Sequence, residues 1–121
     1  MILILAAAAA ACANPQTQTD MTRCAAADYG RADAAMARQW KTTSAYMKGR
    51  DAQVTSRGGG FGYAAALLAS QRAWLKYRDT QCVISAGEFA GGSVQPMAAA
   101  RCKQRLTDVR TSELKTLVWR R

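Results

Sequence analysis

The chain contains no histidine, and this absence limits its chemistry. Its 121 residues also include only eight acidic residues. Histidine is the usual general base near neutral pH, and a pair of catalytic carboxylates would have to come from few, scattered acids. The Ser and Thr residues have no evident base to activate them. The composition therefore predicts a protein that is not an enzyme and that holds no cofactor.

The cysteines include no close pair of the C-x-x-C type. Without histidine, a zinc site would need all four distant thiolates, so disulfides are the expected use of Cys12, Cys24, Cys82 and Cys102. Four cysteines allow three connectivities. We expect Cys12 to pair with Cys24 and Cys82 with Cys102, because each pair joins neighbours across a short loop. Each bond would stabilise the fold by roughly 3 kcal/mol in the chain-entropy model.

The N-terminal apolar run, Met1 to Ala13, is too short for a membrane-spanning helix, which needs about 20 residues. It suits the apolar region of a secretory signal peptide. No Lys or Arg precedes it, a gap that a start codon placed too late would explain. Residues 1–11 are expected to be the signal peptide and residues 12–121 one periplasmic or secreted domain. Lipid anchoring at Cys12 is less favoured, because no large aliphatic residue stands three places before it.

Apolar residues at three- and four-residue spacings predict three helices. Their approximate ranges are 20–48, 63–85 and 95–118. Thr19 or Asp20 would cap the first helix, Gly49 would end it, and Pro96 suits the first turn of the third. The glycine-rich segment 50–62 matches neither phosphate-binding glycine pattern and is expected to be a loop. The predicted fold class is all-α, a small disulfide-stapled three-helix bundle with an N-terminal arm.

Polar residues interrupt the apolar faces of all three predicted helices. Gln71 and Arg78 lie in the middle of the second face, while Asp33 lies among apolar residues of the first. Arg110 and Glu113 share the third face with aliphatic residues. A buried charge must be paired and hydrogen-bonded, so these five residues are candidates for an internal polar network with Asp33 facing Arg78. The alternatives are that the long side chains reach solvent past the apolar surface and that Asp33 is exposed.

The net charge of +9 is spread along the chain. It favours anionic partners, although a solvated, solubilising surface also explains it. No single dense basic arm stands out. Nucleic-acid binding is permitted by the charge but opposed by the export signal and the cysteines.

Specific residues resemble a known family, the LprI-like N-terminal domain family, whose members are small exported helical proteins named for a lysozyme inhibitor. The matching positions are Cys12, Cys24, Tyr29, Asp33, Gln71-Arg72-Ala73-Trp74, Arg78-Asp79, Cys82, Gly91-Gly92-Ser93, Cys102, Arg110 and Leu114. One departure is Met36-Ala37, where the family usually has a Leu-Asn pair. The resemblance implies a non-catalytic protein of the cell envelope, and its matching positions are typical of a fold rather than of an inhibitory site.

The leading hypothesis is therefore an exported binding protein of the lysozyme-inhibitor type, which blocks a glycan hydrolase by occlusion. Its expected partner is a protein such as a lysozyme. The alternative is a basic module that binds anionic envelope polymers, namely lipopolysaccharide, peptidoglycan or phospholipid head groups. Because many animal lysozymes are basic, a chain of charge +9 would need a local acidic or apolar patch to approach one.

Overall fold

The computed structural model describes residues 12–53 and 62–119. This part of the chain forms three long helices, α2 (Gln18–Gln53), α3 (Tyr63–Ala86) and α4 (Gln95–Thr116), with a short 3-10 helix, η1 (Gly87–Phe89), after α3. The predicted all-α, three-helix fold is confirmed. The expected signal peptide lies outside the described residues, as does most of the predicted glycine-rich loop.

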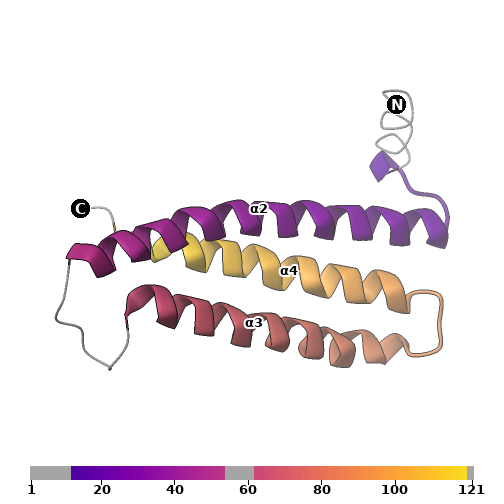
Figure 1. The fold of residues 1–121 in the computed structure, drawn as a ribbon. Helices are drawn as coiled ribbons and strands as arrows, with labels where there is room; N and C mark the ends of the chain where they lie inside the picture. The colour runs from indigo at the N-terminus through magenta and orange to yellow at the C-terminus, as the bar shows by residue number, and fades with distance from the viewer. Residues whose placement is uncertain (1–11, 54–61, 120–121) are drawn as a thin grey trace.

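The three helices run side by side, and α4 lies between α2 and α3 (Figure 1). Helix α4 packs most extensively against α2, whereas α2 and α3 meet least. The turn that joins α3 to α4 lies at the same end of the bundle as the start of α2. On one face of the bundle, a groove lies between α2 and α3.

Both ends of α2 differ from the prediction. Thr17 caps its start, since the Thr17 hydroxyl accepts a hydrogen bond from the Asp20 amide at 3.1 Å, and neither Thr19 nor Asp20 does so. Gly49 does not end α2, which continues to Gln53. A glycine inside a helix costs only about 1 kcal/mol relative to alanine, and the added turn brings Arg50 over the Trp119 ring.

The hydrophobic core is small. Its buried members are Met36, Met47, Leu67 and Leu114. Partly buried aromatic and aliphatic side chains surround them, including Trp40 and Trp74. Two fully buried threonines, Thr43 and Thr107, also lie where α2 and α4 pack, and the Thr43 hydroxyl donates to the Leu114 carbonyl at 2.8 Å. A core with so few large buried side chains provides limited stability, which covalent cross-links can increase.

Two disulfides supply those cross-links. Cys12 is bonded to Cys24 and Cys82 to Cys102, with Cα–Cα distances of 5.4 and 5.5 Å. These are the expected pairs. The first holds the N-terminal arm against α2, and the second joins the end of α3 to the start of α4. None of the described helices combines the length and apolarity that crossing a bilayer requires.

Candidate functional site

Arg78 is the point at which all three helices meet. Only 7% of its surface is exposed. Its Nη1 donates to Asp33 Oδ1 on α2 at 3.2 Å and to Thr107 Oγ1 on α4 at 3.4 Å. Its Nε donates to Asp79 Oδ1 at 3.0 Å. The guanidinium also lies 5.4 Å from the ring centroid of Tyr29. Arg78 is therefore buried and paired, and it does not extend into solvent.

The surroundings of Arg78 shift two pKa values. Burial raises the pKa of Tyr29 above its ordinary value of 10.0, although the nearby charge of Arg78 opposes the shift. Burial alone would lower the pKa of Arg78, but its hydrogen bond to Asp79 and the other neighbouring groups outweigh that effect and raise the pKa. The guanidinium thus stays charged, and it is paired with Asp33 on α2 and Asp79 on α3.

A second buried arginine, Arg110, joins α4 to α3. Its Nε donates to Gln71 Oε1 at 2.9 Å, and its Nη2 donates to Ser70 Oγ at 3.0 Å. The Gln71 amide nitrogen in turn lies 3.6 Å from the sulfur of Met36. The Trp74 ring centroid is 5.3 Å from the Arg78 guanidinium carbon and 6.0 Å from that of Arg110. One indole therefore contacts both buried cations.

The structure corrects the predicted position of Glu113. This residue is exposed, and its carboxylate reaches Arg110 Nη1 at 3.4 Å from outside the interior. Asp33 is also half-exposed, although it makes its bond to Arg78. The reason is physical: a carboxylate left partly in water avoids most of the cost of burial while it still pairs with the buried guanidinium. The interior thus holds Gln71, Arg78 and Arg110, with the acids at its edge.

These contacts indicate that the polar network stabilises the fold. Its polar groups bond to one another or to neighbouring helices, and its three central side chains, Gln71, Arg78 and Arg110, are each at most 7% exposed. Within residues 12–53 and 62–119, no group of acidic and cysteine side chains could hold a metal ion. A binding function must therefore use other surfaces, of which two stand out.

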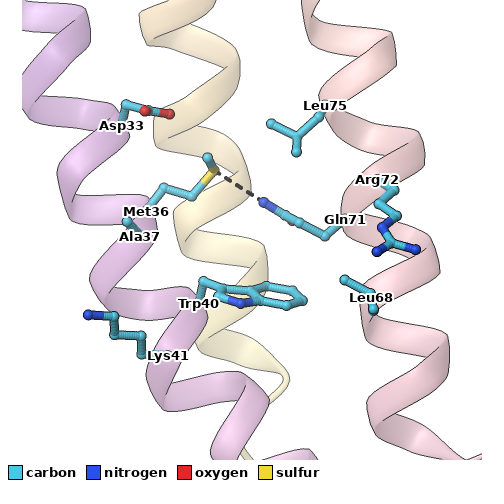
Figure 2. Close-up of a pocket in the computed structure, with 9 residues that line it drawn as sticks. All are labelled: Asp33, Met36, Ala37, Trp40, Lys41, Leu68, Gln71, Arg72 and Leu75. Carbon is cyan, nitrogen blue, oxygen red and sulfur yellow. Dashed lines mark hydrogen bonds between the residues drawn. The ribbon is translucent and has the colours of Figure 1, made fainter.

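The first surface is a groove between α2 and α3, named here the α2–α3 groove (Figure 2). It encloses about 490 Å³. Its lining residues are Asp33, Met36, Ala37, Trp40, Lys41, Leu68, Gln71, Arg72 and Leu75. The Trp40 ring extends from α2 toward α3, where Leu68 lies opposite it, while Leu75 points from α3 into the gap at the level of Met36. Most of the lining is therefore apolar. In the sequence, the groove is indicated only by the apolar faces of the two helices.

The second surface is the α3–α4 tip, defined as residues 83–94. It exposes three large apolar side chains, with exposed fractions of 71% for Val83, 73% for Ile84 and 41% for Phe89. Glu88 is its one charged residue. Because Cys82 is bonded to Cys102, the two helices that carry the tip are cross-linked at its base. The tip therefore combines apolar exposure with a fixed base.

Backbone hydrogen bonds order the tip further. The amides of Ala90 and Gly92 donate to the carbonyls of Gly87 and Phe89 at 3.1 and 3.0 Å. The Gly91 amide donates to the Gln95 side chain at 3.3 Å. Gly91 has a φ of 81°, a conformation that favours glycine over residues with a side chain. The tip is therefore a defined turn.

The sequence analysis did not predict the contact that caps the start of α3. The Asp51 carboxylate accepts hydrogen bonds from the Tyr63 and Ala64 amides, at 2.8 and 3.0 Å, and so caps the start of α3. Tyr46 and Tyr63 make edge-to-face contacts with Trp119 at this end of the bundle. A cap from 12 residues upstream has no local signature in the sequence.

Comparison with known proteins identifies the family of this chain. A family model described as "Lysozyme inhibitor LprI" matches residues 8–114. An uncharacterized protein of Rhizobium meliloti (strain 1021) is 37% identical over 108 residues, which are 88% of this chain and 78% of that protein. No solved structure matches the chain. The family match extends over α2, α3 and nearly all of α4, so the chain belongs to the LprI lysozyme inhibitor family.

Proposed function

We propose that this protein is an exported, non-catalytic protein of the cell envelope that inhibits a lysozyme-type glycan hydrolase by occluding its cleft. The observation that carries the proposal is the family match over residues 8–114, which covers the helical domain almost completely. Export is inferred from the apolar pattern of residues 1–11. The absence of histidine supports a role in binding rather than in catalysis.

Shape favours the α3–α4 tip as the occluding element. The substrate site of a glycan hydrolase is a cleft, so the surface that fills it must project from its own molecule. The tip is the turn at one end of the bundle (Figure 1), and it exposes Ile84 and Phe89. The α2–α3 groove is concave and does not fit a second concavity. Exposed apolar side chains are also typical of protein contact sites.

Charge favours the same surface. A chain of net charge +9 is repelled by a basic lysozyme at long range. The tip contains no Lys or Arg, and Glu88 makes it locally acidic. A basic partner would therefore meet no like charge on the tip itself. The tip has the local apolar and acidic character that a basic inhibitor of a basic enzyme requires.

Rigidity favours tight binding. Association costs free energy when a flexible loop must be ordered, so a loop that is already held in shape binds more tightly. The Cys82–Cys102 bond and the Gly91 turn hold the tip before any partner arrives. Phe89 can then act as an aromatic anchor, the type of residue that contributes most to many interfaces.

The test is a muramidase activity assay with the purified mature protein and single variants. Phe89→Ala and Ile84→Ala should each weaken inhibition by about tenfold or more, as anchor residues do. Tyr77→Ala is the matched control, because Tyr77 is an exposed aromatic residue on α3 outside the tip. Its inhibition should equal that of the unaltered protein.

Two results would contradict different parts of the proposal. If micromolar protein slows none of the muramidases tested, the inhibitor function is wrong. If inhibition occurs but Phe89→Ala and Ile84→Ala leave it unchanged, the inhibitor function stands and the tip is the wrong surface.

The basic surface supports one other candidate, binding to anionic envelope polymers. Salt dependence separates the two. Polymer binding through Lys and Arg should weaken steeply as ionic strength rises, whereas an interface centred on Phe89 should change little. Inhibition that persists in high salt would favour the protein partner.

A further inference from the structure

We propose that the α2–α3 groove binds a single anionic amphiphile, an acyl chain that carries a carboxylate or phosphate head group. This site is separate from the α3–α4 tip and does not depend on inhibition. The proposal rests on three properties of the groove: its size and apolar lining, the internal use of its polar groups, and the cations on its rim.

Size and lining fit an acyl chain. The groove's volume of about 490 Å³ lies within the range of roughly 300–1,000 Å³ that small-molecule sites occupy. Met36 is buried at its base, while Leu68 keeps 39% of its surface exposed. The Trp40 ring extends from α2 into the gap between the helices (Figure 2). Covering such apolar carbon is favourable in proportion to the area removed from water.

The polar groups in the groove wall are already engaged within the protein. The Gln71 carbonyl oxygen accepts from Arg110, and its amide nitrogen faces the Met36 sulfur. Asp33 accepts from Arg78. A sugar would need several polar groups that are available to its hydroxyls, and the wall offers few of them. The groove therefore suits an apolar chain better than a glycan.

Two cations remain on the rim. Lys41 on α2 and Arg72 on α3 are exposed, and neither forms an ion pair with a described residue. Figure 2 places Lys41 at the opposite end of the groove from Asp33, with its ammonium turned away from α3, and places Arg72 on α3 beside Leu68. A negative head group beside Leu68 is complementary to Arg72, and the exposed Lys41 side chain can rotate toward the same head group. The acyl chain would lie over Trp40 toward Leu75.

Brominated acyl chains provide a direct test, because bromine quenches tryptophan fluorescence only at short range. The probes are brominated dodecanoate, brominated dodecyl phosphate and a brominated dodecyl glucoside, each used below its micelle concentration with the folded, oxidised protein. We expect saturable quenching by the two anionic probes with about one ligand per chain. Trp40→Phe should remove most of that quenching, since Trp40 alone of the described tryptophans lines the groove.

Two pairs of variants separate binding in the groove from adsorption. Ala37→Phe fills the groove and should abolish quenching, whereas Ala26→Phe, an exposed alanine elsewhere on α2, should not. Lys41→Gln with Arg72→Gln should weaken binding by about fivefold for each charge removed. Arg101→Gln with Arg105→Gln removes the same charge from exposed positions of α4 and should have little effect.

The relative affinities of the carboxylate and phosphate probes identify the source of the ligand, a free fatty acid or a phospholipid derivative, and binding of either supports the site. Equal binding of the uncharged glucoside would overturn the role of the cations. Quenching that survives Ala37→Phe, or that falls equally with both charge pairs, would show surface adsorption and overturn the site. Absence of quenching by both anionic probes would do the same.

Discussion

The guanidinium of Arg78 on α3 meets the carboxylate of Asp33 on α2 at 3.2 Å, although the two residues are 45 positions apart in the chain. The two sides of this pair differ in environment. The Arg78 side chain is 8% exposed, while that of Asp33 is 50% exposed. Removing the arginine and removing the acid should therefore have different consequences.

Replacing Arg78 by Ala should lower the free energy of unfolding by about 2–4 kcal/mol, because buried contacts with Tyr29 and Trp74 are lost along with its hydrogen bonds. The loss should not exceed this range, since the remaining Asp33 carboxylate can reach water. Denaturant unfolding measures the change. Arg72→Ala, an exposed arginine on the same helix, is the control and should change stability by less than about 0.5 kcal/mol. A comparably small effect of Arg78→Ala would contradict the buried role.

The Asp51 cap should contribute measurably to stability. Asp51→Ala should lower the free energy of unfolding by about 1 kcal/mol, since two amides at the start of α3 lose their acceptor. Gly62→Ala should act in the same direction, because a Cβ at Gly62 would lie 3.0 Å from Asp51 Oδ2. Thermal unfolding measures both variants, with the exposed Asp108→Ala as the control. If Asp51→Ala and Gly62→Ala melt at the same temperature as the unaltered protein, the cap does not contribute to stability.

Alkaline titration should report the burial of Tyr29. The chain has four tyrosines, and burial raises the pKa of Tyr29. The unfolded chain releases this proton first, so the contribution to stability is complete below pH 10.0 and is lost as the pH rises through the raised pKa. The near-ultraviolet absorbance of tyrosinate should include a late-titrating component that Tyr29→Phe removes. A Tyr29→Phe protein that keeps the late component would contradict the assignment.

The Cys82–Cys102 bond should hold the α3–α4 tip. Replacing both cysteines by Ser should lower the free energy of unfolding by roughly 3 kcal/mol. It should also speed amide exchange in residues 83–94. The matched variant without the Cys12–Cys24 bond should speed exchange in the N-terminal arm and leave the tip unchanged. Equal exchange at the tip in both variants would show that the bond does not order it.

Much of the fold followed from local patterns. The spacing of apolar residues predicted the three helices, and the start of α3 at Tyr63 and of α4 at Gln95 agree with the structure. Disulfide pairing between sequence neighbours required no knowledge of distant contacts. The pairing of Arg78 with Asp33 was predicted because a charge on an apolar face needs an opposite charge on the helix that covers it.

Other features depended on the register between helices. Periodicity grouped Glu113 with the inner face of α4, but this residue is exposed, whereas Thr107 is fully buried. Helix α4 packs more extensively against α2 than against α3. Which of its residues are buried therefore depends on where each of these helices contacts it. Small threonines suit that close approach because backbone carbonyls and nearby side chains satisfy their hydroxyls.

The helices, their cross-links and the need for paired interior charges could all be read from the sequence, because they depend on residues close in the chain or on the cost of burying a charge. The tertiary structure decided the Asp51 cap, the α2–α3 groove and the exposure of Phe89 at a fixed tip. Each of these depends on how far and at what register one helix lies from another. That distance results from packing the whole core and is not encoded in any one stretch of residues.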